Sequence, residues 1–81
     1  MTERATMIRI AETVRALRIE RGMSVPDCSN RADISRGQWH DVEAGRRVRY
    51  GPTLDIICRV AVALGVKPSE LFVRAEKENE L

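Results

Sequence analysis

Apolar residues recur every three or four positions along most of the chain, which is the spacing of one buried face on an α-helix. The first residues that share such a face are Met7, Ile10, Val14 and Leu17. We expect their helix to end at Gly22, because glycine accepts the left-handed backbone that commonly closes a helix. The pattern therefore predicts that the first element of the chain is a helix rather than a strand.

Capping residues predict a second helix. Ser24 and Asp27 form an S-x-x-D cap, and the inner face behind it carries Cys28 and Ala32. Asp33 stands where a tight turn must follow, and aspartate tolerates left-handed backbone better than most residues.

The third helix is predicted to begin at Ser35, since Gln38 three residues later completes an S-x-x-Q capping box. Trp39 and Val42 point inward from this helix, and Gly45 is expected to end it. The chain thus contains two short helices joined by a tight turn.

The fourth helix is predicted to begin at its cap Thr53, to run to Leu64 and to close at Gly65. This helix is apolar on almost every side, and its one polar stripe consists of Asp55 and Arg59. A helix of this kind is covered on more than one side, which predicts contact with a partner as well as with the rest of the domain.

Pro68 opens a short fifth helix through Leu71 and Phe72, and the charged remainder, residues 74–81, is compatible with a helical or a frayed form. The expected fold class is an all-α, five-helix domain over residues 1–72, followed by a charged C-terminal tail over residues 73–81. A chain of 81 residues buries only marginally enough apolar surface for a stable fold, and association into a dimer would bury more.

The net charge of +2 is unevenly distributed. Residues 1–69 hold twelve Lys and Arg against eight Asp and Glu, whereas residues 70–81 hold two against four. Twelve of the fourteen basic residues are arginine, which suits bidentate recognition of phosphate and guanine. The body of the domain is therefore basic and its tail acidic.

The sequence contains no cluster of residues that predicts a metal site or a catalytic site. Cys28 and Cys58 stand thirty positions apart with a single histidine in the chain, which is poor metal spacing, so we expect reduced, largely buried thiols and no metal or cofactor. No nucleophile and base form a recognisable set, which argues against an enzyme. No apolar run has the length of a membrane span and no signal peptide opens the chain, so we expect a cytoplasmic protein with no membrane partner.

The stretch Val25–Ala44 resembles the helix-turn-helix of the Cro/repressor-like (Xre-type) bacterial and phage regulators. Its small mid-helix residue is Ser29, and its apolar positions are Cys28, Ala32, Ile34, Trp39 and Val42. The E-x-G of Glu43–Gly45 and the run Pro52–Phe72 are similar to later parts of that family's domain. Three departures are Val25 in place of glutamine, Asp33 in place of glycine and a longer loop over Gly45–Pro52.

The resemblance implies a DNA-reading role for the third helix. The family positions that read base edges match Arg36, Gly37 and Asp41, and Gln38 and His40 lie beside them. For His40 a groove contact and a solvated surface position are equally open. One possible role of Trp39 is stacking on a base, but its inward position in the helix favours burial in the core.

Two further sets of contacts follow. The resemblance implies a buried ion pair between Arg18 and Glu43, with an ordinary solvated pair as the alternative. Helix amino termini suit phosphate oxygens, and so does an arginine loop without acids, although such loops are usually solvated. The expected phosphate-binding residues are Ser24, Ser35, Arg46, Arg47, Arg49 and Thr53.

Together these observations favour a sequence-specific, double-stranded-DNA-binding transcriptional regulator, a homodimeric repressor or controller on an inverted-repeat operator. Its expected dimer residues are Ile56, Val62, Leu71 and Phe72. Repression by occupying promoter DNA and activation through RNA polymerase both remain open. The alternative is a protein-interaction module, such as an antitoxin that masks a toxin, for which the apolar Ile8 and Ile19 offer a surface unless they are stray surface residues.

Overall fold

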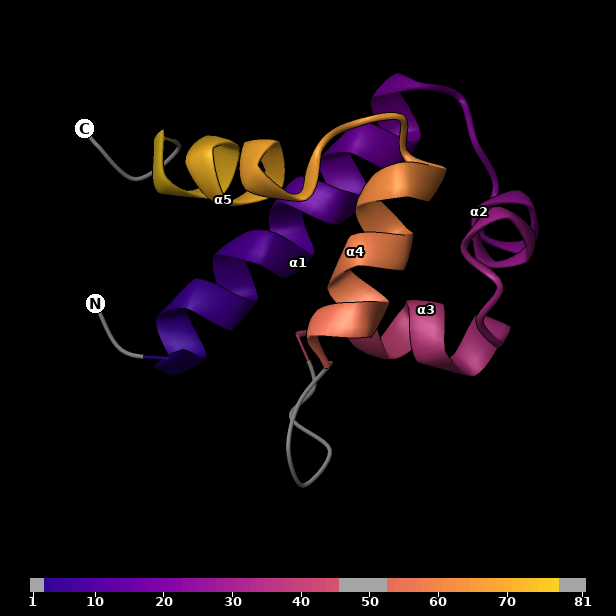
Figure 1. The fold of residues 1–81 in the computed structure, drawn as a ribbon, viewed down its shortest axis with the longest axis horizontal. Coiled ribbons are helices and arrows are strands. Elements are labelled where there is room, and N and C mark those ends of the chain that lie inside the picture. The colour runs from indigo at the N-terminus through magenta and orange to yellow at the C-terminus, as the bar shows by residue number, and fades with distance from the viewer. Residues whose placement is uncertain (1–2, 46–52, 78–81) are drawn as a thin grey trace.

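The computed structural model describes residues 3–45 and 53–77, and these two ranges contain five α-helices and no strand (Figure 1). The helices are α1 (Glu3–Glu20), α2 (Val25–Ala32), α3 (Arg36–Glu43), α4 (Leu54–Ala63) and α5 (Pro68–Lys77). The all-α, five-helix fold class expected from the sequence is confirmed.

The two most extensive packing contacts place α1 against α5 and α2 against α4, while α3 packs on both α1 and α2. In Figure 1, α1 runs diagonally behind α4, α5 lies across one side, and α2 and α3 occupy the opposite side. The chain after α2 therefore turns back toward α1, and α3 comes to lie at the edge of the domain.

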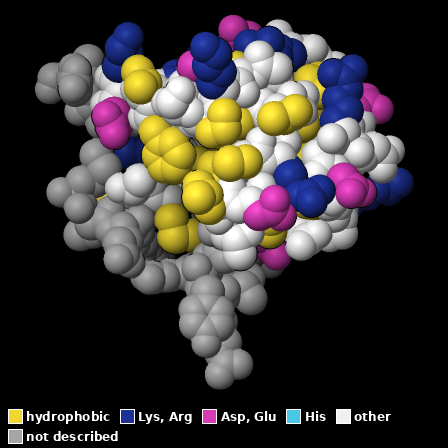
Figure 2. Space-filling model, viewed as in Figure 1, with side chains coloured by type: hydrophobic (Ala, Val, Ile, Leu, Met, Phe, Trp, Pro, Cys, Tyr) yellow, Lys and Arg dark blue, Asp and Glu magenta, His cyan; other side chains and the backbone are white. Residues whose placement is uncertain are grey.

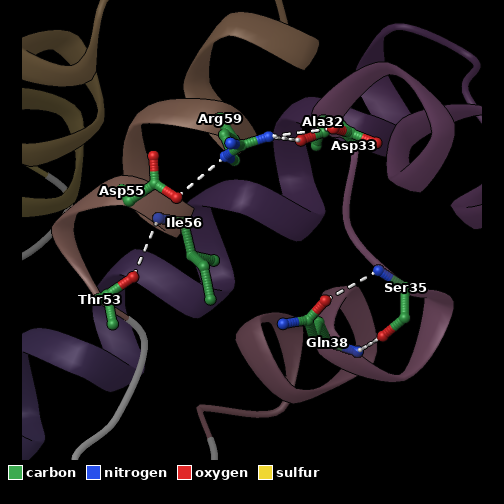
Figure 3. A network of polar contacts seen from close by, with 8 residues as sticks. All are labelled: Ala32, Asp33, Ser35, Gln38, Thr53, Asp55, Ile56 and Arg59. Atoms are coloured by element: carbon green, nitrogen blue, oxygen red, sulfur yellow. Dashed lines mark hydrogen bonds and ion pairs between the residues drawn. The ribbon is translucent and has the colours of Figure 1, made fainter.

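The helix ends follow the capping pattern. The Ser24 hydroxyl accepts the Asp27 amide at 3.2 Å, and the Thr53 hydroxyl accepts the Ile56 amide at 3.3 Å. At the start of α3 the bonds are reciprocal: the Ser35 hydroxyl accepts the Gln38 amide at 3.0 Å, and Gln38 Oε1 accepts the Ser35 amide at 2.9 Å (Figure 3). All three caps expected from the sequence are present.

The turn between α2 and α3 contains Asp33 in left-handed backbone, with φ 55° and ψ 47°. Within the described ranges it is the one non-glycine residue with positive φ. Its amide bonds to the Asn30 carbonyl at 3.2 Å, and the Ile34 amide bonds to the Ser29 carbonyl at 3.1 Å. These two bonds satisfy carbonyls that the end of α2 would otherwise leave without partners.

The core draws residues from every helix. Its fully buried large side chains are Val14, Leu17, Trp39, Val60, Leu64 and Leu71. The segment after Phe72 is helical as far as Lys77, and Ala75 is buried there, so residues 73–77 pack as part of the domain.

One residue expected on a dimer surface lies elsewhere. Leu71 has none of its surface exposed, because α5 turns that side chain into the core of the single chain. Val62 is 70% exposed, whereas Ile56 and Phe72 are half-buried against the core. The expectation for Leu71 is therefore wrong, and Val62 is the most accessible of the four.

Trp39 is the largest fully buried side chain, so its truncation tests the core directly. Trp39→Ala is expected to lower the free energy of unfolding by about 3–5 kcal/mol, the usual cost of removing a core aromatic. Urea denaturation followed by circular dichroism measures the loss. A variant with parental stability that loses only DNA binding would instead show that Trp39 acts by stacking on a base.

Candidate nucleic-acid interface

The helix α3 has one buried and one exposed side. Trp39 and Val42 are buried in the core, at 0% and 5% exposure. The residues expected to read bases divide in two: Arg36, Gly37, Gln38 and His40 are exposed, and Asp41 is half-buried. The structure therefore gathers the first four on the solvent side of α3 and sets Asp41 at its margin.

The far end of α3 is fixed by the carboxylate of Glu43. Arg18 Nε donates to Glu43 Oε2 at 2.7 Å and Arg18 Nη2 donates to Oε1 at 3.1 Å, in the two-pronged geometry that arginine makes with carboxylates. Arg18 Nη1 also donates to the Met23 carbonyl at 3.1 Å. The ion pair is largely buried, since the two side chains are 17% and 9% exposed.

The indole of Trp39 joins this cluster, because its Nε1–H donates to Glu43 Oε2. The hydrogen bond to Glu43 is also the main reason that the pKa of Arg18 rises above its usual value. The indole contact is not among the expectations from the sequence, although Trp39 and Glu43 stand four residues apart on one helix, which is a usable signal. The Arg18–Glu43 pair thus joins three parts of the domain: the carboxylate binds the core anchor of α3, and the guanidinium belongs to α1 and binds the loop before α2.

The helix amino termini expected to meet phosphates are all accessible. Ser24, Ser35 and Thr53 are exposed. Each hydroxyl oxygen accepts a backbone amide in its cap, which leaves the hydroxyl proton to be donated outward. Val25, at the position where glutamine was expected by resemblance, instead packs partly against the core. Arg46, Arg47 and Arg49 lie outside the described residues.

The two thiols differ in their surroundings. Cys28 is fully buried, and burial raises the pKa of its thiol. Cys58 is half-buried on α4, and both are free cysteines.

Over residues 3–45 and 53–77 there is no group of three His, Cys, Asp or Glu side chains placed to hold a metal ion. Within the same ranges, no helix combines the length and apolar character that a membrane crossing needs.

Comparison with known proteins identifies the motif. The family model described as Helix-turn-helix domain matches residues 9–72. The fold is similar to the clp gene regulator ClgR from C. glutamicum, with 18% identity, a TM-score of 0.78 and coverage of 94% of this chain and 95% of that chain. No curated protein sequence matches the chain.

Two further solved structures are restriction-modification controller proteins. C.AhdI from Aeromonas hydrophila is similar with 28% identity, a TM-score of 0.72 and coverage of 80% of this chain and 94% of that chain. A mutant of C.Esp1396I is similar with 19% identity, a TM-score of 0.78 and coverage of 90% of this chain and 89% of that chain. The likeness spans nearly the full length of each of these structures.

The Glu43 cluster generates a stability prediction. Arg18→Met is expected to lower the free energy of unfolding by about 3 kcal/mol, because it leaves a largely buried carboxylate without its cation. Arg74→Met is the matched control, since it breaks the exposed ion pair with Glu20 and is expected to cost at most about 1 kcal/mol. Equal losses in the two variants, measured by urea denaturation, would contradict a structural role for the buried pair.

Proposed function

Because the chain belongs to the helix-turn-helix domain family, we propose that it is a sequence-specific regulator of transcription that reads double-stranded DNA with α3. The observation that carries the proposal is the division of α3 into a buried side, with Trp39 and Val42, and an exposed side that begins at Arg36. A helix held from behind and accessible in front can enter the major groove, whose width admits an α-helix.

Arg36 is the residue we assign to direct base reading. It is exposed in the first turn of α3, and its guanidinium can donate two parallel hydrogen bonds to guanine O6 and N7. His40 lies one turn later on the same side of the helix. Asp41, at the margin, can accept from a cytosine amino group. These donors and acceptors favour a half-site that contains a G·C pair.

Gln38 has a narrower role than its side chain alone suggests. Its Oε1 is engaged by the Ser35 amide in the capping box, at 2.9 Å. The two-pronged contact of glutamine with adenine needs both the amide oxygen and the amide nitrogen. We therefore assign to Gln38 only the donation of its amide N–H groups, to a base edge or a phosphate.

The glycine at position 37 is not required by the fold, and we attribute it to contact with DNA. Among the described residues, a Cβ added at this position would meet the Ser35 hydroxyl alone, at an ordinary contact distance of 3.8 Å. The folded chain therefore has room for a side chain here, although glycine costs a helix up to about 1 kcal/mol relative to alanine. We propose that the missing side chain lets the backbone of α3 approach a thymine methyl group or a phosphate.

The phosphate contacts are assigned to the exposed caps Ser24, Ser35 and Thr53, whose helix amino termini favour anions. Arg46, Arg47 and Arg49, which follow α3 in the sequence, are proposed to add phosphate contacts. Contacts of this kind fix the register of a protein on DNA without reading its sequence.

We propose a homodimer that forms through α4 and the adjoining part of α5. Figure 2 shows hydrophobic side chains gathered in the middle of the face that carries these helices. Leu54 and Val62 are 72% and 70% exposed on α4, and Val73 is 49% exposed on α5. Two-fold pairing of this face would place two α3 helices about 34 Å apart, one turn of DNA, and would select an inverted repeat.

The class of regulator is proposed from the same comparisons. C.AhdI, at 28% identity, is a restriction-modification controller protein of similar length. We propose that this chain is likewise a small controller that occupies promoter DNA, in the cytoplasm, and that it acts on its own operon.

A second candidate function rests on a different surface. Ile8 and Ile19 are 43% and 58% exposed on α1, away from the buried side of that helix. An apolar face of this kind can bind a protein partner, as an antitoxin binds its toxin. Purification from the native operon, with or without a partner retained on size exclusion, separates this function from DNA binding alone.

The dimer prediction uses two exposed apolar residues as a matched pair. Val62→Glu is expected to raise the dimer dissociation constant roughly tenfold or more, because association would then bury unpaired carboxylates. Ile19→Glu on α1 makes the same chemical change away from the proposed interface and should leave the constant unchanged. Sedimentation equilibrium measures both, and a parent that stays monomeric at high concentration and on DNA would overturn the dimer.

The reading prediction concerns Arg36 and Gly37. Arg36→Ala is expected to remove about 1–3 kcal/mol of discrimination at one G·C pair in each half-site, because the two-pronged guanine contact is lost. Gly37→Gln should block docking while the domain stays folded. Quantitative binding to a duplex selected from random DNA by the parent measures both effects, with the exposed Arg15→Ala on α1 as the charge-matched control.

If the Arg36 and Gly37 variants discriminate the selected duplex from scrambled DNA as well as the parent does, α3 is not the reading helix. If the parent selects no sequence at all, the chain does not bind DNA specifically.

A further inference from the structure

Arg59 is half-buried on α4 and faces the turn between α2 and α3 (Figure 3). Its Nε donates to Asp55 Oδ2 at 3.0 Å, one helical turn earlier on α4. Its Nη1 lies 3.4 Å from Asp33 Oδ2 and 3.5 Å from the Ala32 carbonyl oxygen. One guanidinium therefore joins α4 to the turn that leads into α3.

The turn presents two groups that favour a cation. The Ala32 carbonyl belongs to the last turn of α2, where helix carbonyls lack partners within the helix and carry the negative end of the helix dipole. The Asp33 carboxylate adds a full negative charge beside it, on a residue held in left-handed backbone. The family that the sequence resembles usually has glycine at this position, so the Asp33 carboxylate is a departure from that pattern.

Asp55 determines where the guanidinium points. Because Asp55 engages Nε, the Nη1 end of the fork is left facing Ala32 and Asp33. The hydrogen bond that Arg59 donates to Asp55 is also the main reason that the pKa of Arg59 rises above its usual value. The cation is therefore both oriented and permanently charged.

The position of the turn bears on the direction of α3. The residues between the two helices are Asp33, Ile34 and Ser35, and the last of these caps α3. Since α2 already packs on α4, a further bond from α4 to this turn restricts how α3 leaves α2. The start of α3 is then held through Arg59, as its far end is held through Glu43.

We propose that Arg59 is a positioning residue for DNA reading: it binds the Ala32–Asp33 turn and fixes the angle at which α3 meets the major groove. The inference rests on the proposed function, because it assigns a consequence to the pose of α3 on DNA. Arg59 acts through the turn and touches no base.

Two other roles make different predictions. If Arg59 contacted a DNA phosphate directly, its removal would weaken binding to all sequences and lower the salt dependence by about 0.9 unit of slope. If it were an ordinary surface ion pair, neither specificity nor salt dependence would change. A positioning residue lowers the ratio of specific to nonspecific affinity and leaves the slope unchanged.

The test compares Arg59→Gln with Arg74→Gln, which removes an equally exposed arginine from the α5–α1 ion pair with Glu20. The probe is a duplex selected from random DNA by the parent, with a scrambled duplex as the nonspecific reference. Arg59→Gln should lower the specificity ratio roughly fivefold or more, as expected for residues in one network, with an unchanged salt slope and near-parental thermal stability. Arg74→Gln should leave the ratio unchanged.

Arg59→Lys separates charge from geometry. A lysine ammonium retains the charge for a phosphate but cannot span Asp55 and the turn together. We expect the Lys variant to show a lowered specificity ratio as well. Full recovery of the ratio by lysine would overturn the positioning role and favour a phosphate contact.

Amide hydrogen exchange tests the contact between Arg59 and the Ala32–Asp33 turn in the absence of DNA. Arg59→Gln should accelerate exchange at the amides of Asp33 and Ile34, which bond to Asn30 and Ser29, and Arg74→Gln should not. Unchanged exchange, or an unchanged specificity ratio on an enriched duplex, overturns the inference alone. If the parent enriches no duplex, the proposed function fails, and the inference about the pose of α3 fails with it.

Discussion

The carboxylate of Glu43 is the interaction on which the presentation of α3 depends. An isolated helix of eight residues is not stable in water, so α3 owes both its existence and its direction to tertiary contacts. Its buried side supplies only Trp39 and Val42 to the core. Glu43 adds to them by accepting hydrogen bonds from Arg18 and from the Trp39 indole, which ties α3 to α1 and leaves the opposite side accessible.

Apolar burial and polar ties have separate tasks in this small domain. Burial of side chains from every helix drives folding without specifying direction. The polar ties then join helices that are distant in sequence: Arg18 to Glu43, Arg59 to the turn at Asp33, and Arg74 to Glu20. The first binds the far end of α3 and the second binds the turn that precedes it, so contacts that join the helices of the fold also flank the proposed reading helix.

The parts of the structure that could be predicted from sequence are local ones. The reciprocal bonds of Ser35 with Gln38 and the left-handed turn at Asp33 depend on residues a few positions apart. Helical periodicity identifies an apolar side but not what covers it, so it places Leu71 on a dimer surface although that side chain fills the core. Contacts across long stretches of chain, such as Arg59 with Ala32, leave no periodic signal.

In the proposed complex, two copies of the chain each read guanine in the major groove with α3. Methylation interference at guanine N7, on a duplex selected by the parent, tests it most directly because N7 is exposed only in the major groove. We expect two interfering guanines related by two-fold symmetry and about one helical turn apart, with interference at both lost in Arg36→Ala. Interference confined to adenine N3 in the minor groove, or unaffected by Arg36→Ala, would show that α3 does not read guanine in the major groove.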